Sequence, residues 1–263
     1  MNSIPQIVDK LYWRREKDGH ILAFSNTAGT KFLNPTSALI FSSIDGKNTV
    51  GDIVEILQKK YFQVDKEELK KDIIECLYSF KTLRFIKWKR DDKDMENDDN
   101  RFSVEVVGEE NYSELSKFIL SSFSPKADIE NIVRYLPGSG KALYTDIAIR
   151  TRQFHLSELN LYSRRGQKFT SWVSITGLNT PDKPVDILGF MVSKENIEDL
   201  YYTYQSAENV AKSNGRIKMK FVAIESLLSE EIYTFLDKIG LKREAVLEKE
   251  SGNDNVFVFS KFL

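Results

Sequence analysis

The feature that most constrains the fold of this chain is a ten-residue acidic run. Residues 91–100 read DDKDMENDDN, with six acidic residues and one basic residue. Such a segment offers no apolar stripe to a helix or a strand, and its like charges repel one another. We therefore predict a solvated linker at 91–100, between an N-terminal module (residues 1–90) and a C-terminal module (residues 101–263).

Composition excludes several classes of protein. The 263 residues are 41% apolar and include 17 Phe, 11 Tyr and 3 Trp, enough for a substantial core. We find no apolar run of about 18 residues and no signal-peptide core at the N-terminus, so a membrane span or export is not expected. Because Cys76 is the only cysteine, disulfides within the chain and thiolate zinc sites are excluded. We expect a cytoplasmic protein without a metal.

The charge of the N-terminal module raises the question of nucleic acid. Residues 1–90 carry 16 basic and 11 acidic residues, a net charge of +5, whereas residues 101–263 carry 21 and 22, a net charge of −1. The lysines of the first module are scattered and form no single stripe. A DNA-reading winged helix with an effector-sensing domain would also concentrate Arg and Asn on one recognition helix. We therefore expect no nucleic-acid partner.

The N-terminal module reads as three short strands followed by three helices. Strand-like runs at 11–17 and 20–25 flank Asp18-Gly19, which is a strong hairpin signal. A third strand at 31–34 precedes helices that begin near Pro35 and Thr49. The third helix, 66–83, carries an apolar stripe at helical spacing, namely Leu69, Ile73, Cys76, Leu77 and Phe80. This order is typical of a winged helix-turn-helix, an α+β fold.

Residues 5–90 also resemble a known family. The run FLNPTSALIFSSIDGKNTVGDIVEILQKKY, followed by a charged helix ending in LRFI, is similar to PqqD-like domains, the recognition elements for ribosomally made, modified peptides. The resemblance implies that a precursor's leader peptide adds as a strand beside the third strand and packs on the third helix. The implied peptide-binding residues are Lys31, Phe32, Leu33, Lys70, Ile74, Tyr78 and Lys81. Packing within the protein is an equal alternative for Ile74 and Tyr78.

The C-terminal module alternates between strands and helices. We expect a strand from Phe102, helices at 112–123 and 128–135, three strands between 154 and 192, a helix at 196–214, a strand at 217–224, a helix at 229–239 and a final hairpin at 243–263. The turn LPGSGK at 136–141 lacks the spacing of a phosphate-binding loop. The element order and the tail IYTFLDKIGLKREAVLEKESGNDNVFVFSKFL resemble the GNAT acetyltransferases, with a mixed α/β sheet.

The GNAT resemblance implies an acyl-CoA site, for acetyl-CoA or a longer acyl-CoA. The implied cofactor-binding residues are Val192, Ser193, Lys194, Asn196 and Ser229. The chain departs from the family here, because Glu195, Glu198 and Leu200 stand where the family keeps one polar or basic and two small residues. Carboxylates repel a pyrophosphate, and a leucine side chain blocks the approach of the backbone.

The resemblance implies catalytic roles for Glu225 and Tyr233. Glu225 ends a strand where some relatives keep a carboxylate that helps to deprotonate an amine. Many relatives have a tyrosine proton donor where this chain has Leu236, and Tyr233 lies one turn earlier. A solvated charge and a core side chain are the plain alternatives for these two residues.

Two functions follow, and both stay open. In the first, the N-terminal module captures the leader and the C-terminal module acylates an amine of the tethered precursor, whose effective concentration is raised by the tether. In the second, the C-terminal module is not catalytic, and the protein presents the precursor to partner modifying enzymes. Acyl transfer is our working prediction from the sequence.

Overall fold

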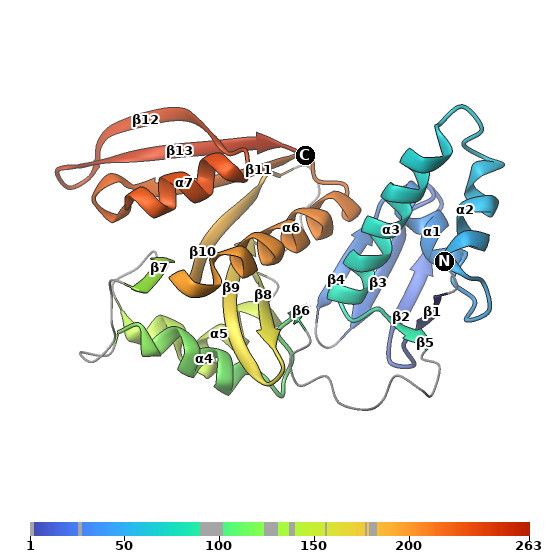
Figure 1. The fold of residues 1–263 in the computed structure, drawn as a ribbon, viewed down its shortest axis with the longest axis horizontal. Helices are drawn as coiled ribbons and strands as arrows, with labels where there is room; N and C mark the ends of the chain where they lie inside the picture. Colours follow the sequence, from blue (N-terminus) through green and yellow to red (C-terminus); the bar gives the residue numbers. More distant parts are fainter. Residues whose placement is uncertain are drawn as a thin grey trace.

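The computed structural model describes residues 3–25, 28–89, 102–123, 131–136, 140–155, 157–176, 178 and 183–263. Its N-terminal and C-terminal modules lie side by side, with helices from each meeting between them (Figure 1). The predicted linker at 91–100 and residues 137–139 of the turn at 136–141 lie outside these residues. No helix in the described part of the chain is long and apolar enough to cross a membrane.

The N-terminal module contains the predicted three-stranded antiparallel sheet, in the order β2-β3-β4. The strands are β2 (Tyr12–Arg15), β3 (Ile21–Ser25) and β4 (Gly29–Leu33), and the helices are α1 (Pro35–Ser42), α2 (Val50–Gln58) and α3 (Lys66–Thr82). Asn34 caps α1 by accepting a hydrogen bond from the Ser37 amide, as its place before Pro35 predicts. Thr49 and Asp52 form a capping box that fixes the start of α2.

The N-terminal module also contains a second small sheet. β1 (Ile4–Ile7) pairs antiparallel with β5 (Ile86–Lys89) and joins the two ends of the module. The sequence analysis did not predict β1, because four residues that include Pro5 carry almost no local strand signal. The three-stranded sheet and helices fit the predicted order, and the sequence FIKW at 85–88 also indicates the closing strand β5, so that only β1 and its pairing with β5 are additions.

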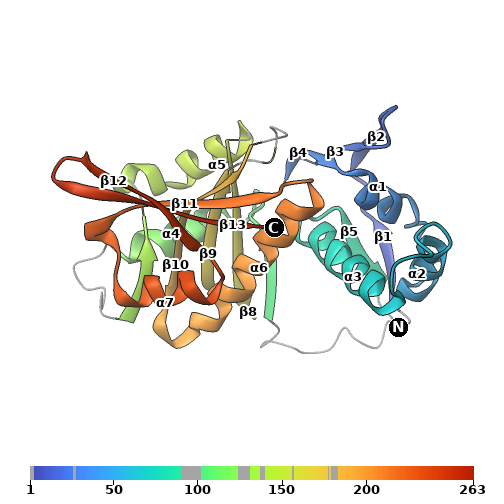
Figure 2. The same ribbon diagram turned by 90° about the horizontal axis from the view of Figure 1, so that it is seen from above.

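The C-terminal module is a mixed sheet in the order β12-β13-β11-β10-β9-β8-β6. Its strands are β6 (Phe102–Val106), β8 (Glu158–Arg165), β9 (Lys168–Thr176), β10 (Val185–Ser193), β11 (Lys218–Ile224), β12 (Lys242–Ser251) and β13 (Asp254–Phe262). Alternate residues of β8, β9 and β10 divide between two apolar clusters, one on each face of the sheet. The helices α4 (Tyr112–Ser121) and α5 (Asp146–Phe154) cover one face, and α6 (Ile197–Ser213) and α7 (Glu230–Lys238) cover the other (Figure 2).

Two predictions for this module were wrong. The described part of the predicted helix 128–135 includes a strand, β7 (Ile132–Tyr135), which pairs antiparallel with β10. The helix α5 was missed, so that His155 follows a helix and does not begin a strand. The β7 segment is short, and its alternation of apolar and polar residues is weak. It forms a strand because β10 offers it an unpaired edge.

Candidate functional site

The structure brings the predicted cofactor-binding residues to one place. Val192 and Ser193 end β10, and a short 3₁₀ turn, η4 (Lys194–Asn196), leads from them into α6. Ser229 precedes α7. The Lys194 ammonium donates a 2.6 Å hydrogen bond to Glu231 in the first turn of α7, which joins the two helix starts. The predicted residues therefore lie around the starts of α6 and α7.

The electrostatics of this cluster do not suit a pyrophosphate. Glu198 and Asp199 lie in the first turn of α6, where their charges compensate the positive end of the helix dipole. Asp199 is fully buried and accepts two hydrogen bonds from the Arg165 guanidinium, of 2.6 and 3.1 Å. The hydrogen bond from Lys194 lowers the pKa of Glu231 to about 2. The basic residue of the cluster is thus already neutralised by a carboxylate.

Beside this cluster the strands β10 and β11 separate, and a third strand, β7, occupies the gap between them. The parallel strands β10 and β11 pair only from Val185 to Ile187, and an irregularity follows in β10 before Gly189. Beyond it, β7 pairs with β10 over Phe190–Ser193. β7 therefore lies in the space into which two diverging parallel strands would otherwise open.

Tyr135 of β7 completes this closure. Its ring lies edge-on to Phe221 of β11, with centroids 4.7 Å apart, and 6.2 Å from the ring of Phe190 of β10. Its hydroxyl donates to the Val222 carbonyl at 3.2 Å and accepts from the Ile224 amide at 3.3 Å. The Tyr135 side chain thus packs against β10 and is hydrogen-bonded to β11, next to Glu225 at the end of that strand.

The two predicted catalytic residues lie near each other at the end of β11 and on α7. Glu225 begins the 3₁₀ turn η5 (Glu225–Leu227) and accepts a 2.8 Å hydrogen bond from Asn255. Burial, and then the charge of Glu225, raise the pKa of Tyr233, so its hydroxyl stays protonated at neutral pH. Tyr233 is partly exposed and packs against Phe259, whereas Leu236 is buried in the core. Tyr233 is therefore the proton-bearing member of the pair, and Glu225 lies beside it.

The predicted peptide-binding residues fall into two groups that the structure does not bring together. Lys31 and Leu33 point into the protein, and Lys31 is only 1% exposed, whereas Phe32 lies on the opposite face of β4. On α3 the four predicted positions follow one line, and the exposed Tyr78 ring lies 6.3 Å from Trp88 of β5. The other three positions of this line are Lys70, Ile74 and Lys81.

The C-terminal module occupies the side of α3 that is nearest to β4. α6 packs along α3, and the hydroxyl of Ser213 hydrogen-bonds the thiol of Cys76, whose pKa burial raises to about 12. Asn34 donates to the Lys212 carbonyl at 3.4 Å. Burial, and then the charge of Arg216, lower the pKa of Lys31 to about 7. The third strand of the small sheet is therefore part of the contact between modules.

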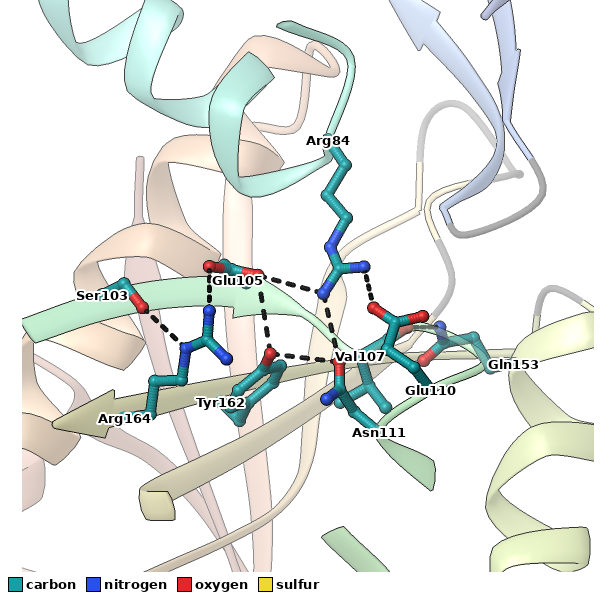
Figure 3. A network of polar contacts seen from close by, with 9 residues as sticks. All are labelled: Arg84, Ser103, Glu105, Val107, Glu110, Asn111, Gln153, Tyr162 and Arg164. Atoms are coloured by element: carbon teal, nitrogen blue, oxygen red, sulfur yellow. Dashed lines mark hydrogen bonds and ion pairs between the residues drawn. The ribbon is translucent and has the colours of Figure 1, made fainter. Parts of the chain in front are cut away.

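Arg84 forms a second contact between the modules, which the sequence analysis missed (Figure 3). It follows α3 with a left-handed φ of 57°, and its guanidinium reaches the loop between β6 and α4. It donates to Glu105 of β6 at 3.0 Å and to Asn111 of that loop at 3.2 Å, and it pairs with Glu110. A Cβ atom on Gly108 would lie 2.6 Å from this guanidinium, so glycine leaves the space that the contact needs.

The Arg84 contact is part of a wider polar network. Tyr162 donates to Asn111 at 3.2 Å, and Arg164 donates to Glu105 at 3.4 Å and to Ser103 at 3.3 Å (Figure 3). Glu105 therefore receives two guanidinium groups, one from each module. Such a network fixes the relative position of the modules.

Comparisons with known proteins match the two modules separately. Residues 25–86 match the family model described as coenzyme PQQ synthesis protein D (PqqD). A ribosomal-protein-S5-alanine acetyltransferase from Vibrio fischeri is 12% identical, with a TM-score of 0.49 over 64% of this chain and 95% of that chain. A GNAT-family acetyltransferase from Streptococcus pneumoniae is 15% identical, with a TM-score of 0.49 over 62% and 99% of the two chains.

A third solved structure was determined with a ligand. Mycobacterium smegmatis RimJ, in complex with CoA-disulfide, is 9% identical, with a TM-score of 0.45 over 62% of this chain and 83% of that chain. A search of curated proteins finds no match to the chain. Because every one of these TM-scores is below 0.5, the similarities assign no activity or ligand to the C-terminal module.

Proposed function

We propose that the protein binds a precursor peptide and presents it to separate modifying enzymes, because residues 25–86 match the PqqD family model. The N-terminal module is the peptide-binding part. The C-terminal module, with its GNAT-like strand order, serves as a rigid structural partner and not as an acyltransferase. The Arg84 network and the packing of α3 on α6 support this role, because they join the two modules closely.

The closure of the β10–β11 opening by β7 is the observation that carries this choice. An acyl-CoA held at the start of α6 would need a path along β10 to bring its thioester near Glu225 and Tyr233. That edge of β10 is paired with β7, and the buried Tyr135 bridges it to β11. At the start of α6 the nearby cations are already paired with carboxylates, Lys194 with Glu231, Lys238 with Glu198 and Arg165 with Asp199. These residues do not fit an acyl-CoA.

Acyl transfer to an amine of the precursor is the second candidate. The short pairing of β10 with β11 and the proximity of Glu225 to Tyr233 favour it. It requires β7 to leave β10, with loss of the ladder at Phe190–Ser193 and of both Tyr135 hydrogen bonds. Those interactions make this the less favourable reading of the geometry.

Selection from a randomised-peptide display library on the immobilised full-length protein tests the proposal. We expect a family of extended peptides to be enriched, and the synthesised peptides to bind the protein in solution. Failure to enrich any peptide that binds in solution would contradict peptide binding. A separate measurement of acyl-CoA binding distinguishes the adaptor function from the acyltransferase function.

A further inference from the structure

The three-stranded sheet of the N-terminal module has two edge strands, and only one of them lies beside the C-terminal module. β4 carries the buried Lys31 and continues into Asn34, which contacts the end of α6. β2, at the other edge, has four exposed residues. We propose that the precursor peptide adds as an antiparallel or parallel strand to the open edge of β2. This inference rests on the proposed function and names the site at which it operates.

The register of the sheet identifies the free backbone groups of β2. The Glu16 amide donates to the His20 carbonyl at 2.8 Å, and the pairs Arg14–Leu22 and Tyr12–Phe24 follow at intervals of two residues. Inward and outward residues alternate in an antiparallel ladder. The N–H and C=O groups of Trp13 and Arg15 therefore point away from β3, where an added strand can use them.

The side chains of β2 complete a groove for such a strand. On the core side, the half-exposed Trp13 ring (46%) lies edge-on to Phe41 of α1, 5.5 Å away, and Arg15 donates to the Ser42 hydroxyl at 2.6 Å. On the outer side, Tyr12 is 71% exposed and lies 6.5 Å from Phe24. An added strand would therefore meet aromatic surface on both faces of the sheet.

The charge around β2 defines the chemistry of the occupant. Residues 9–17 include four basic and two acidic residues, and Arg14 and Arg15 lie within the strand itself. Arg14 pairs with Glu16, whereas Arg15 has a neutral partner in Ser42. A carboxylate beside Arg15 would form a charge-assisted hydrogen bond. The expected ligand is an extended peptide that alternates apolar and acidic residues.

Other strand edges carry features that oppose strand addition. β12 has six charged residues among its ten and two irregularities in its register. β1 contains Pro5, which lacks an N–H donor. Charges, irregular pairing and proline are the common ways in which proteins protect edges. β2 also carries two arginines, but it has regular pairing throughout and no proline, and its other two residues are aromatic.

Proline substitution with a matched alanine control tests the site. Arg15→Pro removes one outward N–H, whereas Arg15→Ala removes the same side chain and keeps that N–H. Proline is tolerated at such a position, because the lost donor makes no bond to β3. We expect display-enriched peptides to bind Arg15→Pro about tenfold more weakly than Arg15→Ala, the effect of about one hydrogen bond with its register.

The same pair of variants at the opposite edge provides the alternative outcome. The β3–β4 register directs the Phe32 N–H away from β3, so Phe32→Pro against Phe32→Ala probes strand addition at β4. A proline-specific loss at Phe32, with equal binding by Arg15→Pro and Arg15→Ala, would overturn the β2 site while leaving peptide binding intact. If the wild-type protein enriches no peptide, the proposed function itself fails.

Amide hydrogen exchange on the wild-type protein keeps the test valid if a proline variant misfolds. An enriched peptide should slow exchange at Trp13 and Arg15, whose amides have no partner strand, and leave Thr30 and Phe32 unchanged. Protection at Thr30 and Phe32 alone would overturn the proposal. Circular dichroism of each variant establishes that the fold is retained.

Discussion

Truncation of Arg84 tests whether the polar network holds the two modules together. Arg84→Ala removes hydrogen bonds to Glu105 and Asn111 and the ion pair with Glu110. Hydrogen bonds to charged groups contribute about 1.5–3 kcal/mol each. The Glu110 side chain is 60% exposed, so its pair contributes less than about 1 kcal/mol, and Glu105 keeps Arg164 as a partner. We expect the free energy of unfolding to fall by about 2–4 kcal/mol.

Arg84→Gly separates the effect of the lost contacts from the effect of the strained backbone. The residue has a φ of 57°, a conformation that costs a non-glycine residue about 1 kcal/mol and costs glycine almost nothing. Arg84→Ala keeps this strain, and Arg84→Gly relieves it while losing the same contacts. The glycine variant should therefore be more stable than the alanine variant by about 1 kcal/mol.

Urea unfolding followed by tryptophan fluorescence and circular dichroism measures both differences. Arg14→Ala is the control, because Arg14 is exposed and pairs only with its neighbour Glu16, so we expect a change below about 0.5 kcal/mol. If Arg84→Ala were as stable as Arg14→Ala, the network would not hold the modules. A glycine variant less stable than the alanine variant would refute the role assigned to the backbone.

Three further predictions concern the β7 closure and the buried Lys31. Tyr135→Phe loses the bonds to the Val222 carbonyl and the Ile224 amide, and should lower the free energy of urea unfolding by about 1–2 kcal/mol; an unchanged value would mean that the hydroxyl does not bridge the strands. Gly189→Ala would place a Cβ 3.0 Å from Trp172 and 3.1 Å from the Tyr135 carbonyl, and should cost about 1–3 kcal/mol, in contrast to Gly140→Ala, whose Cβ would meet only the Ala142 amide nitrogen at an ordinary 4.0 Å. Lys31 has a pKa of about 7 in the folded protein, against an ordinary value of 10.5. Between these pH values the unfolded state binds one more proton than the folded state. The free energy of unfolding should therefore rise with pH, by up to about 1.4 kcal/mol per pH unit. Lys31→Met should flatten that rise in unfolding experiments across this range, and an unchanged slope would show that Lys31 is charged when buried.

The sequence predicts those elements whose signals are local. Asp18-Gly19, Asn34-Pro35 and Thr49 correctly place a hairpin and two helix starts, because turn and capping preferences depend on neighbouring residues. The tail hairpin is recognised for the same reason. β1 and β7 were missed, because each is a four-residue strand that exists only through pairing with a distant strand.

The candidate site was predictable in its location but not in its state. The family resemblance implies a ligand site at the start of α6, and Glu198 and Leu200 already depart from the expected pattern there. No local pattern reveals that Tyr135, about 90 residues before Ile224, fills the opening. In the same way, Lys31 reads as an exposed strand lysine until the contact with the C-terminal module buries it.

Calorimetric titration of the full-length protein with acetyl-CoA, alongside a long-chain acyl-CoA, tests the central claim most directly. We expect no saturable binding of either compound. β7 and Tyr135 fill the space between β10 and β11, and carboxylates occupy the start of α6. Saturable binding of either compound in the wild-type protein would contradict this claim, and would restore acyl transfer to the precursor as the function to be pursued.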